Sequence, residues 1–298
     1  MKQLLEDLYS VDLVKKKSLY ALLLGIGYAI IGIGCAVLLF PEDPAIVAVA
    51  FTAILFLPLL RQVLITEEEE ECEKVRVDGN SKFSIIQFFK DHHEIFKIYL
   101  FFFIGVLLVF SFFAIVLPNL ATNYIFKNQL EVMYGTAVNS GNAMALNFDS
   151  NLFTGILLNN TIVMVLCFIT AFIIGDGALF LITWNASVWG TIFGNLAQTA
   201  AIASGKNPIL YFLIVLIIVL PHMILEAFAY FSGAGAGAIV SRGITKEKFM
   251  SPAFIRIIKG TLLLLLVAVI FLLIGALVET YVLENVDVYR TIIMQSFG

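Results

Sequence analysis

Long, uninterrupted apolar runs alternate with short polar linkers along this chain. Seven runs stand out, at residues 19–40, 44–60, 98–117, 155–174, 178–200, 208–240 and 260–283. About 20 apolar residues in a helix cross the hydrocarbon core of a bilayer, whereas a membrane β-strand alternates apolar and polar residues. Because these runs are continuous, the pattern predicts an all-α fold, a polytopic transmembrane helical bundle of about seven spans.

Composition agrees with a membrane protein. Of the 298 residues, 60% are hydrophobic and only 13% are charged, whereas about 25% of residues are charged in a soluble domain. A soluble fold has no place for this excess of apolar surface, so we expect a multi-pass protein of the cell membrane with the lipid bilayer around it. Basic residues are too few and too scattered for a nucleic-acid surface, so no nucleic-acid partner is expected.

Lys and Arg residues gather in three polar segments, and their positions predict how the chain threads the bilayer. These segments are the N-terminus up to Lys17, residues 61–97 and residues 241–259. Short loops rich in Lys and Arg stay on the cytoplasmic side. The least apolar run, 178–200, is either a polar-faced span or a re-entrant pair. Seven spans place all three basic segments on one side, so we expect a cytoplasmic N-terminus and an external C-terminus.

The first 97 residues differ in character from the rest of the chain. Residues 1–97 combine an amphipathic N-terminal segment, a transmembrane hairpin and a cytoplasmic acidic loop that begins at Glu67. Acidic blocks of this kind are usually solvated spacers. The segments 1–17 and 82–97 are expected to form amphipathic helices at the membrane interface. Residues 98–298 form the expected transmembrane core.

Two ionisable residues lie in the middle of the run at 208–240. His222 and Glu226 follow Pro221 and are four residues apart, so they share one face of a helix. An ionisable side chain at the bilayer centre costs roughly 2.5–3.5 kcal/mol on insertion scales, and such residues commonly mark functional sites. This pair is therefore the centre of the candidate site.

Three interpretations of this pair are open. In the first, His222 and Glu226 hydrogen-bond to each other and to Asn159 or Asn160 in a buried polar network. In the second, they bind a metal ion or a proton, although a closed zinc site takes four ligands. In the third, they line the path of a transported ion or substrate. Asp176, between two glycines, belongs to the same set of intramembrane polar residues. No cofactor is expected, with a metal ion on His222 and Glu226 as the alternative.

Small residues follow Glu226 on the same helix. Gly233 and Gly237 have the spacing that lets two membrane helices approach closely. We interpret them as packing residues.

Several short polar and glycine-rich motifs in 155–243 occur together in a known family. They are Asn159-Asn160, Gly175-Asp176-Gly177, the stretch Asn185 to Gly190, and Pro221-His222-Met223-Ile224-Leu225-Glu226 followed by small residues. This region resembles the stage II sporulation protein M family of bacterial and archaeal membrane proteins. The family pattern usually has Gly directly after the His, where this chain has Met223.

The resemblance implies the function of a membrane scaffold rather than of an enzyme. The bacterial namesake of the family is a membrane scaffold in an engulfment complex, whose partners degrade peptidoglycan. We therefore expect a non-enzymatic scaffold or transport-associated component, with membrane protein partners or a second copy of the chain. The alternative is an intramembrane metal-dependent hydrolase, or an ion or solute transporter, that uses His222 and Glu226.

Overall fold

A computed structural model describes residues 14, 15, 17–78, 85–132 and 151–297. Most of these residues are helical, and no strand occurs among them. The helices are α3 (Leu19–Leu39), α4 (Pro44–Asp78), α5 (Ile85–Val116), α6 (Asn119–Ile125), α8 (Asn151–Ile174), α9 (Ala178–Ser204), α10 (Pro208–Lys246), α11 (Pro252–Asn285) and α12 (Asp287–Phe297). The predicted all-α bundle is confirmed. Most of the amphipathic segment predicted at 1–17 lies outside the described residues.

Six of these helices are long and apolar enough to cross a membrane. They are formed by Leu19–Leu39, Pro44–Thr66, His93–Val116, Asn151–Ile174, Pro208–Thr245 and Phe254–Asn285. The seventh predicted span, α9, is one unbroken helix of 27 residues rather than a re-entrant pair, and 16 of its residues are buried. It is less apolar than the other spans because it is surrounded mainly by other helices of the protein and less by lipid.

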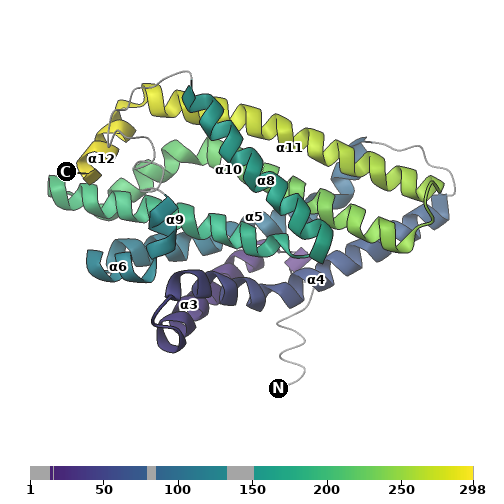
Figure 1. The fold of residues 1–298 in the computed structure, drawn as a ribbon, viewed down its shortest axis with the longest axis horizontal. Coiled ribbons are helices and arrows are strands. Elements are labelled where there is room, and N and C mark those ends of the chain that lie inside the picture. The colour runs from purple at the N-terminus through teal and green to yellow at the C-terminus, as the bar shows by residue number, and fades with distance from the viewer. Residues whose placement is uncertain (1–13, 16, 79–84, 133–150, 298) are drawn as a thin grey trace.

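The helices form a bundle in which α9 has neighbours on several sides (Figure 1). α9 contacts α4, α5, α10 and α12, while α3 packs on α4 and α5. On the other side, α10 packs against both α8 and α11, and α8 crosses α10 at an angle (Figure 1). The candidate site residues lie where α8, α10 and α11 meet.

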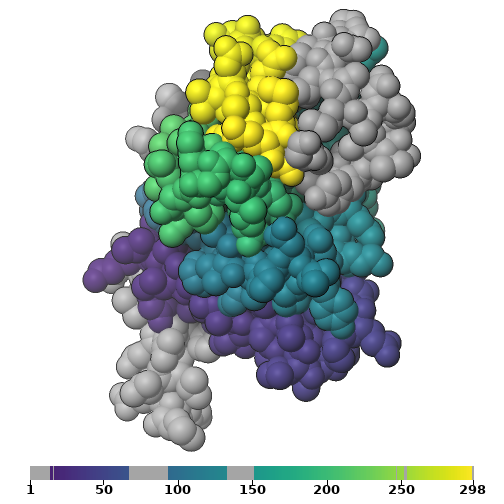
Figure 2. All heavy atoms as spheres, turned by 90° about the vertical axis from the view of Figure 1, so that its left-hand side faces the viewer, coloured from purple at the N-terminus to yellow at the C-terminus, as the bar shows by residue number. Residues whose placement is uncertain are grey.

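Hydrogen bonds between linkers and helix ends define the two ends of the bundle. One end gathers α12, the α9–α10 turn, α6 and the α3–α4 turn, which Figure 2 shows on a single face. We call it the α12 end, and its bonds join Tyr124 to Pro41, Gln129 to Ala45, Gln198 to Leu117 and Tyr211 to Gln295. At the opposite end, the Arg242 end, the guanidinium of Arg242 donates to the carbonyl of Leu64 over 3.1 Å.

These contacts show that α9 runs from one end of the bundle to the other. Asp176, just before α9, lies in electrostatic contact with Tyr99, as does Arg242. Gln198, near the other end of α9, donates hydrogen bonds to the carbonyls of Ile115 and Leu117 at 3.0 and 2.7 Å. α9 therefore crosses the full bundle as a span does.

Two predicted segments between α4 and α5 are continuous with the spans. The acidic stretch from Glu67 prolongs α4, which remains helical to Asp78. The described part of the segment 82–97, from Ile85 onward, belongs to α5. Glu is a good helix former, and the acidic stretch contains no Gly or Pro that would end a helix. The helix therefore continues past the end of the membrane-spanning segment.

Candidate functional site

The site begins on α10, which passes through Pro221 without ending. His222 and Glu226 are both buried, with 6% and 3% of their surface exposed. One turn further, Tyr230 is 1% exposed. Because residues four apart stand above one another on a helix, Glu226 and Tyr230 present their polar groups to the same neighbours.

These neighbours come from two other helices. The hydroxyl of Tyr230 donates to Oδ1 of Asn160 on α8 over 2.8 Å. The carboxyl group of Glu226 lies in side-chain hydrogen-bond contact with Asn160 and also with Glu279 of α11. Three helices thus contribute to one polar cluster, which we call the Glu226–Glu279 site: Asn160, Glu226, Tyr230 and Glu279.

The bond from Tyr230 fixes how Asn160 is oriented. Its Oδ1 atom accepts the Tyr230 hydroxyl proton, and the exposed neighbour Asn159 directs its Nδ2 to the same oxygen at 3.5 Å. The contact of Asn160 with Glu226 is then made by its amide nitrogen, because an ionised carboxyl group only accepts hydrogen bonds. The amide group of Asn160 is therefore the donor that faces one oxygen of the Glu226 carboxyl group.

The second oxygen of Glu226 has no such donor. Its Oε1 atom is buried and makes no hydrogen bond, and Nδ1 of His222 is likewise buried and unpaired. A buried polar atom without a partner costs about 1–3 kcal/mol. The site therefore contains unused hydrogen-bonding capacity in its interior.

The structure brings some of the predicted residues together, since Asn160 lies beside Glu226 as predicted, whereas His222 is not joined to Glu226. Within the described structure no hydrogen bond or ion pair joins His222 to Glu226, although the two are four residues apart. The carboxyl group of Glu226 turns toward α8 and α11 instead. Asp176 lies at the Arg242 end beside Tyr99, away from the cluster.

Sequence reasoning missed Glu279. It lies near the end of the apolar run 260–283. Its position becomes clear from Gly275 on the preceding turn of α11: a Cβ atom there would lie 3.2 Å from Cγ of Glu226. This close approach of α10 and α11 brings the next turn of α11, with Glu279, alongside Glu226. The sequence did contain a signal for Glu279, because a carboxyl group one turn after a glycine within an apolar run indicates a charged side chain near a close helix contact.

The metal-binding side chains of the described residues do not gather into a group of three or more. Across the described ranges, no three His, Cys, Asp or Glu side chains are close enough to hold a metal ion together. His222 and Glu226, the candidate ligands from the sequence, do not acquire a third ligand of that kind.

Comparison with known protein families finds a match to the sequence of this chain. Residues 98–282 match the family model described as stage II sporulation protein M. The chain belongs to the stage II sporulation protein M family. Neither a curated protein nor a solved structure matches the chain.

The family segment contains the whole site. It runs from the transmembrane part of α5 to the last turns of α11, and so includes all four residues of the Glu226–Glu279 site. The N-terminal hairpin of α3 and α4 lies entirely outside the segment that matches stage II sporulation protein M, and so does α12.

Proposed function

We propose that the protein is a non-enzymatic, transport-associated membrane component whose Glu226–Glu279 site acts on ions within the bilayer. The observation that carries this proposal is the contact between carboxyl groups from two different helices, α10 and α11. A carboxyl group inside a membrane is costly, and in other membrane proteins such groups mark ion pathways and proton relays. Two of them side by side double that cost.

Position supports the same role. Glu226 is buried, whereas Glu279 is half-buried, so the pair links the interior of the bundle with its surface. Because the two groups belong to separate helices, a change in their charge acts directly on the packing of α10 against α11. A site of this kind can couple ion uptake to helix movement.

A scaffold role is the second candidate, and α4 is the feature that favours it. The membrane-spanning part of α4 ends at Thr66, but the helix continues to Asp78, over about 18 Å. We propose that this part of α4, at the Arg242 end, holds a protein partner outside the lipid. Membrane protein partners, or a second copy of the chain, are the partners we propose for this role.

The hydrolase alternative has no observation in its favour. No hydrogen bond or ion pair joins its two proposed ligands, His222 and Glu226, in the described structure, and no third residue of metal-binding type joins them there.

Ion movement through reconstituted vesicles tests the transport proposal. Vesicles with the full chain and a trapped pH dye should respond to an imposed ion gradient, and Glu226→Gln or Glu279→Gln should reduce the rate at least about tenfold. Glu284→Gln is the matched control because this residue is exposed on the same helix. If wild-type vesicles respond no faster than empty ones, the transport role is wrong and the scaffold role takes its place.

We also propose that the Arg242 end faces the cytoplasm, because the basic segments 61–97 and 241–259 both adjoin it. In a background without Cys35, Cys72 and Cys167, a membrane-impermeant maleimide should label Lys127→Cys in intact cells. It should label Lys248→Cys only after the cells are opened. Both positions are exposed, so labelling with the opposite pattern would show that the protein is inserted the other way round.

A further inference from the structure

We propose that Glu226 and Glu279 form a proton-binding site that holds one proton between the two carboxyl groups and exchanges it at the α12 end. This inference rests on the proposed transport-associated function and names the ion. Four observations carry it: the contact of the two carboxyl groups, the absence of a nearby cation among described residues, an unpaired buried oxygen, and the position of α12 beside Glu279.

The carboxyl contact itself requires a positive charge. Two carboxylates close together in a poorly solvated place cannot both stay ionised, and such pairs commonly share one proton. Among the described residues no Lys or Arg acts on either carboxyl group. Among the described residues, the other titratable groups in electrostatic contact with the cluster are Tyr230 on α10, Cys167 on α8 and Tyr289 on α12, and none of these carries a positive charge.

A proton fits the cluster better than a metal ion does. A hard cation such as Ca²⁺ takes six to eight oxygen ligands. Here the oxygen of Asn160, the atom that a cation would need as a ligand, already accepts a hydrogen bond from Tyr230. Two carboxyl groups that make direct contact need only one shared hydrogen, which forms the bond between them.

The unpaired Oε1 atom of Glu226 provides a place for the proton to move. It is buried and has no hydrogen-bond donor, and only 3% of the surface of Glu226 is exposed. Nδ1 of His222, one turn earlier on the helix, is a second unpaired acceptor if the imidazole proton is on Nε2. A carboxyl group with a free oxygen can accept a proton there without first breaking another bond.

The route to water passes Glu279 and α12. Glu279 lies two turns before the end of α11 at Asn285, and Tyr289 of α12 is in electrostatic contact with it. Burial, together with the neighbouring Glu279, raises the pKa of Tyr289, so its hydroxyl stays protonated and remains a hydrogen-bond donor. The half-buried Glu279 is thus the member of the pair that meets the surface.

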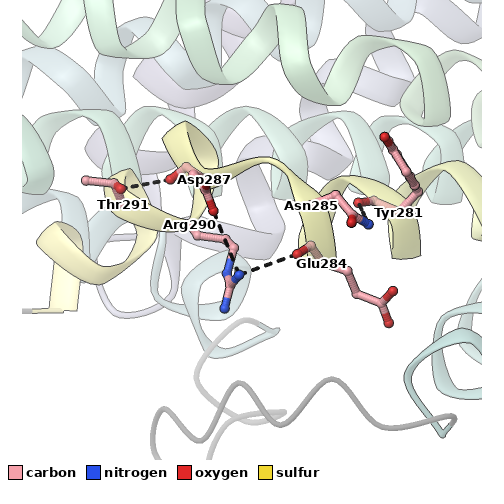
Figure 3. Close-up of polar contacts among 6 residues, drawn as sticks. All are labelled: Tyr281, Glu284, Asn285, Asp287, Arg290 and Thr291. Atoms are coloured by element: carbon pink, nitrogen blue, oxygen red, sulfur yellow. Dashed lines mark hydrogen bonds and ion pairs between the residues drawn. The ribbon is translucent and has the colours of Figure 1, made fainter.

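The joint between α11 and α12 holds Tyr289 in that position. Figure 3 shows Arg290 reaching back to the carbonyl of Glu284 and to Asp287, at 3.4 and 4.0 Å, while the Glu284 carboxyl points away. At the other end of α12, Gln295 accepts a hydrogen bond from Tyr211 over 3.0 Å. These contacts hold α12, which packs mainly on α9, with Tyr289 in electrostatic contact with Glu279.

Infrared spectroscopy of the full chain in lipid tests the proton directly. At pH 7 the wild type should show the carbonyl band of one protonated carboxylic acid that is absent from the double variant Glu226→Gln/Glu279→Gln. Glu284→Gln should keep the band. Loss of one acid per chain supports the proposal. No loss, loss of two acids, or removal of the band by added Na⁺ or Mg²⁺ would each overturn it.

Exchange in heavy water tests the route. The band should shift in D₂O, and Tyr289→Phe should slow the shift at least about tenfold, while the exposed Tyr281→Phe leaves the rate unchanged. Equal rates in all three proteins would overturn the route. Neither measurement depends on transport. A protonated pair in a protein that moves no ions would therefore refute the proposed function alone, and ion movement without a protonated acid would refute this inference alone.

Discussion

Glu226→Ala is expected to lower the free energy of unfolding by about 1–3 kcal/mol, because it leaves buried partners unpaired. The alanine removes the acceptor for Asn160 and the partner of Glu279 at once. Glu226→Gln keeps the shape and the hydrogen bonding, so it should stay within about 1 kcal/mol of wild type, in line with the small average worth of such bonds in membrane proteins. Unfolding in detergent, by heat or by denaturant, measures both.

The alanine variant has a matched control on α11. Glu284→Ala removes an exposed carboxyl group from a neighbouring helix and should leave stability unchanged. If Glu226→Ala is as stable as wild type, the pair is not part of a packed core. If Glu226→Gln is stable but inactive in the vesicle assay, the role of Glu226 depends on its acid group and is functional rather than structural.

Gly237→Ala is expected to destabilise the bundle by about 1–3 kcal/mol, the usual cost of an overfilled core. A Cβ atom at this position would lie 2.2 Å from the carbonyl oxygen of Phe168 on α8, so one helix must move. In a helix without a clash, replacing glycine by alanine stabilises the helix by about 1 kcal/mol. A loss of stability in this variant would therefore result from the clash. Unfolding in detergent, as for Glu226, gives the measurement.

Gly235 supplies the control on the same helix. A Cβ atom there would meet only Leu264, at an ordinary 3.6 Å, so Gly235→Ala should be neutral or slightly stabilising. Since α8 carries Asn160, a displaced α8 in Gly237→Ala should also weaken the bond from Tyr230 to Asn160. Equal stability of the two alanine variants would show that α8 and α10 are less closely packed than the structure has them.

The packing of the glycines illustrates what sequence spacing predicts well. Gly233 and Gly237 were expected to allow a close helix contact, and a Cβ atom on Gly233 would lie 2.8 Å from the carbonyl oxygen of Met164 on α8. The packing interpretation is confirmed. The spacing alone did not say which helix they pack against, because small residues are compatible with any neighbour.

The candidate site shows the opposite case. Helical spacing placed His222 and Glu226 on one face, but spacing describes the backbone and not the direction of the side chains. Glu226 turns to Asn160 and Glu279 because the close approach at Gly275 brings α11 within reach. His222 is buried without that partner.

The sequence by itself determined the fold class and the course of the spans, because the cost of placing unpaired backbone groups in lipid leaves long apolar runs only the helix. It also singled out Glu226, since a carboxyl group in such a run is rare. Only the tertiary structure decided its partner. Glu226 and Glu279 are 53 positions apart in sequence, and their contact depends on how α10 and α11 cross, which no local pattern encodes. The burial of α9 was decided in the same way, by the helices that surround it.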